Sequence, residues 1–226
     1  MVMLHKFWHF SVVMLGLYPL GGYADVPHDK TATYDIENAE DINELCAGCH
    51  GRKGQGGKGG IYPRLAGLTP EYMTRQIESF KSRERINLPM LPYANDRELS
   101  QQDVHDITHY LAAIDLPTQL PRSSEVIDGL ERLRQSKSIV QIGRYPGNIN
   151  QGERIYMEAC RACHQRDGVG RTDKPRLRGQ YTQYLKKQMH DFKKGTRQHV
   201  DWEVKFADLS DNDINNILAF LSILDD

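Results

Sequence analysis

The sequence is poor in the features that define several classes of protein. Its 226 residues contain 4 cysteines and 2 tryptophans, and 29 basic and 30 acidic residues leave a formal net charge of −1. Four cysteines are too few for a disulfide-dense scaffold of this length, and the balanced charge excludes a strongly basic protein that binds nucleic acid. Hydrophobic residues make up 39% and charged residues 26% of the chain, which is the composition of a folded globular protein.

Long apolar runs are also scarce, and the main one lies at the start of the chain. Lys6 precedes a mostly apolar stretch over residues 7–20, and Gly21-Gly22-Tyr23-Ala24, with three small residues, follows. A positive start, a short apolar middle and a small-residue end are typical of a secretory signal. The alternative is a retained membrane anchor, which needs about 20 apolar residues. We therefore predict a signal peptide over residues 1–24 and a periplasmic location.

The four cysteines occur in two copies of one pentapeptide. Cys46-Ala47-Gly48-Cys49-His50 recurs 114 residues later as Cys160-Arg161-Ala162-Cys163-His164. Further matches follow each copy: residues 63–67 match 175–179, residues 72–80 match 184–192, and Leu99-Ser100 matches Leu209-Ser210. A repeat of this length indicates two modules of the same kind.

Each module has the pattern of several short helices, and strand signals are nearly absent. The last helix of each copy begins with a capping-box pattern, Ser100-x-x-Asp103 in the first and Ser210-x-x-Asp213 in the second. We predict an all-α fold. The predicted boundaries are 25–120 for an N-terminal domain, 121–147 for a linker with a helix in its charged part, and 148–226 for a C-terminal domain.

The pattern C-x-x-C-H after a helix is the attachment signature of a c-type haem. Two cysteines three residues apart reach the two vinyl groups of one porphyrin, and the histidine that follows presents its imidazole to the iron. Zinc and a redox disulfide are the alternatives, but neither accounts for a histidine directly after both second cysteines. We predict two covalent haem c groups, attached through Cys46, Cys49, Cys160 and Cys163, with His50 and His164 as iron ligands.

These modules resemble the tandem dihaem class I cytochromes c of the cytochrome c4 type. The resemblance rests on the two C-x-x-C-H motifs, each followed by Pro-x-Leu-x-Gly and an amphipathic Tyr…Gln…Phe-Lys helix, and covers roughly residues 35–224. It implies two class I cytochrome c folds whose haems meet across the domain interface. It also implies that the carbonyl groups of Pro63 and Pro175 accept hydrogen bonds from the proximal histidines and fix their orientation.

The sixth iron ligand differs between the two copies. The resemblance implies a methionine from the loop before the last helix, and the first copy has Met90 there, between prolines. The corresponding loop of the second copy, residues 195–208, contains no methionine. Alignment of the repeats puts His199 one residue from the position of Met90, so we predict His199 as the sixth ligand of the second iron. The alternatives are an open iron, or Lys205, His190 or Met189 as the ligand.

Two haems without a catalytic motif predict an electron carrier, and no residue is assigned a catalytic role. Methionine ligation raises a haem potential, so the second haem would have the lower one. Redox proteins are the expected donors and acceptors, such as a respiratory oxidase or a dehydrogenase, and association with a membrane complex is compatible with this role. The alternatives are an enzyme that acts on a small anion or a peroxide at the second haem, an electron-transfer subunit of a larger oxidoreductase, and a gas-binding sensor.

Two further patterns concern surface charge and histidine spacing. Residues 25–120 contain 10 basic and 15 acidic residues, whereas residues 161–205 contain 12 basic and 5 acidic residues. The basic stretch predicts either a solvated helix face or a docking region for an acidic partner or small anion. His105 and His109 have the i, i+4 spacing of metal ligands, but no further ligands accompany them in sequence, which favours a polar helix face over zinc.

Overall fold

The computed structural model describes residues 33–120, 128–137, 139–199 and 206–224. The chain separates into two units, Met1–Thr31 and Ala32–Asp226. The first unit, which contains the predicted signal peptide, lies outside the described residues, and so does Lys205. None of the described helices has the length and apolar character needed to cross a bilayer.

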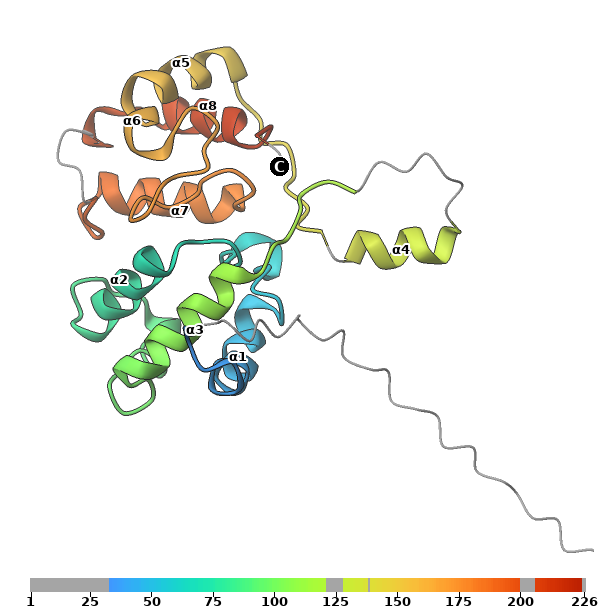
Figure 1. Cartoon of the computed structure of the whole chain (residues 1–226). Coiled ribbons are helices and arrows are strands. Elements are labelled where there is room, and N and C mark those ends of the chain that lie inside the picture. Colours follow the sequence, from blue (N-terminus) through green and yellow to red (C-terminus); the bar gives the residue numbers. More distant parts are fainter. Residues whose placement is uncertain (1–32, 121–127, 138, 200–205, 225–226) are drawn as a thin grey trace, which may run out of the picture. The chain divides into compact units, whose positions relative to one another are not determined.

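The first module consists of the helices α1, α2 and α3, labelled in Figure 1, and two 3-10 turns. Side chains start each helix: Asp35 accepts a hydrogen bond from the Asn38 amide, Thr69 from Tyr72, and Ser100 forms the predicted capping box with Asp103. Such caps satisfy backbone donors that have no partner within the helix. The elements are α1 (Ile36–His50), η1 (Lys58–Gly60), α2 (Pro70–Lys81), η2 (Leu88–Met90) and α3 (Gln101–Ala113).

The second module repeats the order of the helices, but its motif helix is split and its described residues include no 3-10 turn in the place of η1. Helix α1 runs through the whole first motif, whereas the corresponding segment is split at Cys160 into α5 and α6. The predicted capping box of Ser210 and Asp213 is present. The elements are α5 (Ile149–Ala159), α6 (Arg161–His164), α7 (Thr182–Lys193), η3 (Phe206–Asp208) and α8 (Asp211–Leu221).

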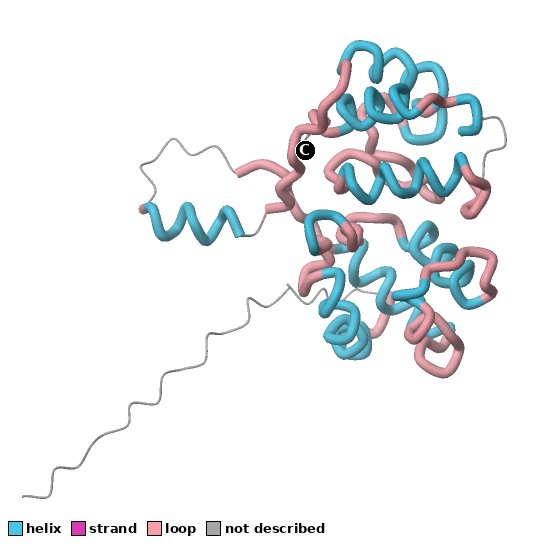
Figure 2. Tube along the Cα trace, turned by 180° about the vertical axis from the view of Figure 1, so that it is seen from behind, coloured by secondary structure: helices cyan, strands magenta, loops and turns pink. Residues whose placement is uncertain are grey.

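The described parts of the chain contain helices and loops only (Figure 2). Two isolated bridges, Gly57 with Tyr62 and Arg171 with Lys174, lie at related places in the two copies. The prediction of an all-α fold is therefore confirmed. Helix α4 (Gly129–Lys137) lies within the predicted linker and exposes Leu130 and Leu133.

Each module has its own apolar core. In the first, α1, α2 and α3 contribute Ala39, Met73 and Ile107, among others. In the second, α5 and α8 cross so closely that a Cβ atom at Gly152 would lie 1.9 Å from the carbonyl oxygen of Asn216. Only glycine permits this crossing.

The two modules are in contact at the glycine-rich loop of the first. The ring of Tyr181, which precedes α7, packs against Gly56 and Gly60, where a Cβ atom at either glycine would lie 2.5 Å from a tyrosine atom. Both glycines also have positive φ angles, 89° and 95°, which other residues rarely adopt. Next to this contact, the side chain of Gln180 donates to the carbonyl oxygen of Arg64 (2.9 Å) and accepts from its amide (3.0 Å). These buried contacts join the modules.

Candidate haem-binding site

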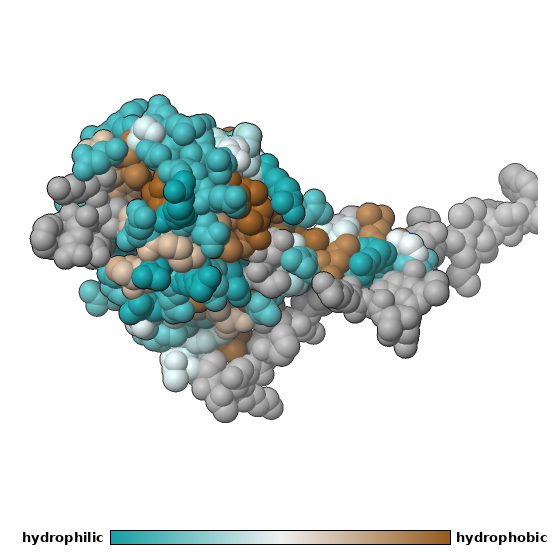
Figure 3. All heavy atoms as spheres, turned by 90° about the horizontal axis from the view of Figure 1, so that it is seen from above, coloured by the Kyte–Doolittle hydropathy of each residue, from teal (hydrophilic) through white to brown (hydrophobic). Residues whose placement is uncertain are grey.

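Both cysteine motifs line one cavity of about 1110 Å³. This volume exceeds the roughly 300–1,000 Å³ of typical small-molecule pockets, as expected for a site that takes more than one large cofactor. The face of the molecule in Figure 3 is largely hydrophilic, with apolar residues exposed in a few places. Three exposed apolar side chains, Leu45, Ile61 and Ile86, belong to the cavity lining. An apolar cavity of this size suits porphyrins.

The two motif histidines are held in the form that binds metal. The Nδ1 atom of His50 lies 3.0 Å from the carbonyl oxygen of Pro63, and that of His164 lies 2.8 Å from the carbonyl oxygen of Pro175. A carbonyl oxygen can only accept, so Nδ1 carries the proton and Nε2 keeps its lone pair. Burial lowers the pKa of His50 and lowers that of His164 to about 4. Both imidazoles are therefore neutral at pH 7.

The motif cysteines are partly buried thiols. Burial raises the pKa of Cys46 to about 11 and that of Cys160 to about 12. Redox and zinc-binding C-x-x-C pairs use a thiolate, and their surroundings lower the pKa of the thiol. In this protein the surroundings raise it. Four thiols on the wall of a porphyrin-sized cavity fit thioether attachment instead.

Basic side chains supply positive charge to the same cavity. Arg75, Arg85, Arg176 and Arg197 line it, and the Nε atom of Arg75 is buried without a hydrogen-bond partner among the described residues. Burial, together with the nearby charge of Arg64, lowers the pKa of Arg176 to about 10. The carboxylate side chains of haem would offset this concentration of positive charge. The residues present therefore fit two haem groups.

Met90 lies in η2 and lines the cavity that also contains His50. Its backbone is fixed by three hydrogen bonds: its amide donates to Asn87, and its carbonyl oxygen accepts from Tyr93 (3.1 Å) and Ala94 (2.9 Å). This backbone arrangement holds the thioether of Met90 at the cavity wall.

His199 lies close to His164 of the second cysteine motif. The ring centroids of His164 and His199 are 6.3 Å apart. Two imidazoles on opposite sides of one metal have centroids roughly 6 Å apart, because each metal–nitrogen bond is about 2 Å and each centroid lies about 1 Å beyond its nitrogen. Phe192 and Phe206 each place a ring centroid 5.1 Å from that of His199. The separation of the two ring centroids is therefore close to that expected for two imidazoles on one metal.

The other candidates for a sixth ligand are placed less favourably. Met189 is 9% exposed and belongs to the apolar core of the second module, although it also touches the cavity. His190 is not part of the cavity lining. Lys205 lies outside the described residues.

An arginine of the first module reaches into the second at the cavity. Arg85 donates hydrogen bonds to the hydroxyl of Tyr184 (3.2 Å) and to Oε1 of Gln188 (2.8 Å). Its guanidinium carbon also lies 4.6 Å from the ring centroid of Phe80 in its own module. The guanidinium is thus held between one helix of each module.

Arg197 makes the reciprocal contacts. It donates to the hydroxyl of Tyr72 (3.1 Å) and to Oε1 of Gln76 (2.9 Å) in the first module, and it lies over the ring of Phe192 at 4.7 Å. The residues of one set of contacts correspond to those of the other at the repeat offset of 112 residues: Tyr72 to Tyr184, Gln76 to Gln188, and Arg85 to Arg197. Sequence reasoning recognised the repeated Tyr…Gln helix but not that each arginine bonds to the other module.

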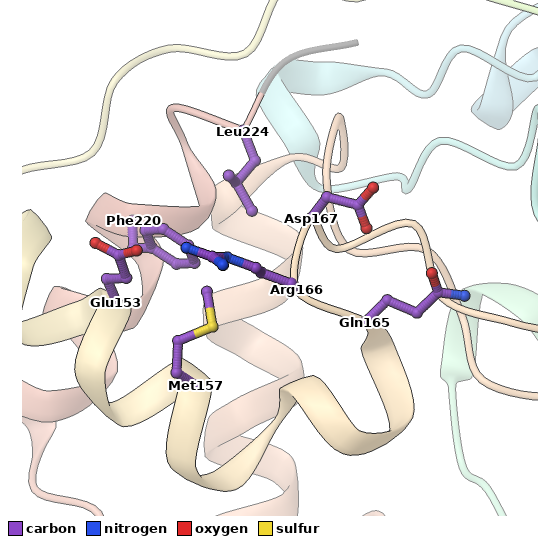
Figure 4. A pocket seen from close by; sticks show the side chains of 7 residues that line it. All are labelled: Glu153, Met157, Gln165, Arg166, Asp167, Phe220 and Leu224. Atoms are coloured by element: carbon purple, nitrogen blue, oxygen red, sulfur yellow. The ribbon is translucent and has the colours of Figure 1, made fainter.

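A smaller pocket of about 450 Å³ lies on the second module, and none of the motif residues lines it. In Figure 4 the side chain of Arg166 extends toward Phe220 and Glu153, above Met157. The pocket contains no cysteine or histidine. We assign no cofactor to it.

Two family models match the chain, one in each module. A model described as cytochrome c matches residues 37–115, and one described as cytochrome c oxidase, cbb3-type, subunit III matches residues 147–221. Each match contains one C-x-x-C-H motif. The repeat in the sequence therefore corresponds to two cytochrome c domains with two covalent haem c groups.

Full-length relatives extend this result across both modules. Cytochrome c4 of Pseudomonas aeruginosa is 31% identical over 184 residues, which is 78% of this chain and 82% of the relative. A thiosulfate dehydrogenase electron acceptor of Stutzerimonas stutzeri is 31% identical over 174 residues, covering 76% and 73% of the two chains. The crystal structure of reduced recombinant cytochrome c4 from Pseudomonas stutzeri shares the fold, with a TM-score of 0.62 at 24% identity and coverage of 84% and 98%. The chain belongs to the cytochrome c4 family of dihaem electron-transfer proteins.

Proposed function

We propose that this protein carries electrons in the periplasm through two unlike haems. The first iron is ligated by His50 and Met90, and the second by His164 and His199. The observation that carries this proposal is the 6.3 Å between the ring centroids of His164 and His199. The signal peptide predicted for residues 1–24 supports the periplasmic location.

The unlike ligands give electron transfer between the two haems a direction. Methionine ligation raises a haem potential relative to ligation by two histidines, so an electron on the second haem moves to the first. The haems supply the electron-accepting chemistry. The protein holds each imidazole through the carbonyl groups of Pro63 and Pro175 and aligns the two modules through Arg85 and Arg197.

The charge distribution supports electron entry at the second module. Residues 161–205 contain 12 basic and 5 acidic residues, whereas residues 25–120 are net acidic. Opposite charges speed the encounter of two proteins, more so at low salt. A relative is named as the electron acceptor of thiosulfate dehydrogenase. We therefore propose a dehydrogenase with an acidic docking surface as the donor and a respiratory oxidase as the acceptor.

The alternative of a substrate-binding second iron receives less support. An enzyme or gas sensor needs an open coordination position, whereas the 6.3 Å between the ring centroids of His164 and His199 supports a position filled by His199. All four cysteines belong to attachment motifs, so none is left as an axial ligand of the second iron.

Carbon monoxide distinguishes the carrier from these alternatives. We expect the reduced wild-type protein to form no carbon monoxide complex at either haem, because both irons have strong sixth ligands. The variant His199→Gly should bind one carbon monoxide per chain, and this serves as the positive control. Absorption difference spectra measure both. Binding of one equivalent by the wild type, or steady turnover of thiosulfate or peroxide, would contradict the carrier.

A further inference from the structure

We propose that His105 and His109 on α3 form a copper(II)-binding site, separate from the haems. Neither histidine lines the haem cavity. Their rings lie one helical turn apart, with centroids separated by 4.2 Å and planes inclined by 36°. The side chain of His105 is 42% exposed, so an ion from solution can reach the pair.

The separation of the rings indicates the kind of metal. Two imidazoles at a right angle on one metal have centroids roughly 4.4 Å apart, whereas a tetrahedral angle places them roughly 5 Å apart. The observed 4.2 Å is closer to the right angle, which square-planar and tetragonal copper(II) or nickel(II) prefer. Copper(II) binds nitrogen ligands most tightly of the divalent first-row metals.

Hydrogen bonds already hold His109 in the tautomer that a metal requires. Its Nδ1 lies 2.7 Å from the carbonyl oxygen of His105, and since a carbonyl oxygen only accepts, this nitrogen carries the proton. The Nε2 atom of His109 makes no hydrogen bond to any described residue. Its lone pair is available.

A buried carboxylate orients His105 in the same way. The Nδ1 atom of His105 lies 3.2 Å from Oδ1 of Asp106, which is completely buried. Asp106 also accepts hydrogen bonds from Asn38, Gln102 and the amide of Asp35. A carboxylate behind a histidine is a common support for metal-binding imidazoles.

The second module shows that the fold does not require these histidines. At the repeat offset of this helix, Asn215 and Ala219 of α8 stand in the places of His105 and His109. Asn215 accepts a hydrogen bond from Tyr145, and Ala219 is completely buried. Two histidines are thus an addition of the first module rather than a feature of the helix.

The carboxylate is likewise an addition. Asn216 corresponds to Asp106, and its Oδ1 accepts from the amide of Asn148 at 2.8 Å, as Asp106 accepts from Asp35 at 3.1 Å. A neutral amide therefore suffices to anchor the start of the first helix of a module, α1 or α5. The negative charge occurs only in the module that has the histidine pair.

Titration of the full-length dihaem protein with copper(II) chloride tests this site. We expect equilibrium dialysis to show a copper equivalent that the double variant His105→Asn, His109→Ala has lost. The paramagnetic resonance of that copper should show coupling to two nitrogens. Nickel(II) and zinc(II) should bind more weakly. Asp106→Asn should weaken copper binding about tenfold, since removing such a support costs roughly 10–100-fold in affinity.

His190→Asn on α7 is the matched control and should bind copper as the wild type does. The substitutions place second-module residues at equivalent positions, so we expect unchanged haem absorption and thermal stability. Should the double variant be unstable, His105→Asn alone provides the test, because this side chain is partly exposed. Copper binding of equal stoichiometry and affinity in the wild type and the histidine variants would overturn the proposal.

Discussion

Replacing His199 by methionine should raise the potential of the second haem on the order of 100 mV, within the roughly 0.8 V over which axial ligands set haem potentials. A thioether donates less electron density to iron(III) than an imidazole does. It therefore stabilises the oxidised state less and favours the reduced state. Phe192 and Phe206 form an apolar surrounding for residue 199 that a methionine side chain can share. Spectroelectrochemical titration would measure the two midpoint potentials.

The reciprocal variant Met90→His provides the matched comparison. It should lower the potential of the first haem and remove the thioether charge-transfer band of the wild type, whereas His199→Met should add a second such band. His190→Met on α7 should change neither potential. If His199→Met left both midpoint potentials unchanged, His199 would not be an iron ligand.

Replacing Arg85 by methionine should lower the free energy of unfolding by about 3 kcal/mol. The guanidinium donates to Tyr184 and Gln188 of the other module and to Gln76 of its own. Hydrogen bonds to a charged group contribute roughly 1.5–3 kcal/mol each, and the acceptors left behind lose their partner in a partly buried site. Methionine keeps the apolar stem, so the loss reports the polar contacts. Guanidinium chloride denaturation of the dihaem protein measures it.

Two comparisons separate the contact between modules from a general effect of losing an arginine. Arg97 is exposed, and Arg97→Met should change the free energy of unfolding by no more than about 0.5 kcal/mol. A double-mutant cycle of Arg85→Met with Tyr184→Phe should give a coupling of about 0.5 kcal/mol or more, because the two side chains are in contact. Additive effects in this cycle would mean that the hydrogen bond across the junction does not stabilise the protein.

Features that depend on neighbouring residues in the sequence were predictable. The C-x-x-C-H motifs act within one helical turn, and the capping boxes of Ser100 and Ser210 link residues three apart. The all-α fold follows from the same short-range signals. The break of the second motif helix at Cys160 was not predictable, because the residues on either side have no helix-breaking signal.

Features that depend on the packing of one module against the other could not be predicted. The sequence contains the repeated Tyr…Gln pattern, but a repeat does not say whether Arg85 bonds within its own module or to Tyr184 of the other. In the sequence, the glycines of residues 51–60 indicate only a loop. In the structure, Gly56 and Gly60 provide room for Tyr181. Likewise, the spacing of His105 and His109 gave no hint of the buried carboxylate of Asp106 beside them.

The electron paramagnetic resonance spectrum of the oxidised wild-type protein tests the central claim of two unlike haems most directly. With His50 and Met90 on one iron and His164 and His199 on the other, we predict two low-spin signals in equal amounts, one typical of histidine–methionine ligation and one of ligation by two histidines. Two histidine–methionine signals, or a high-spin signal from half of the iron, would contradict this account.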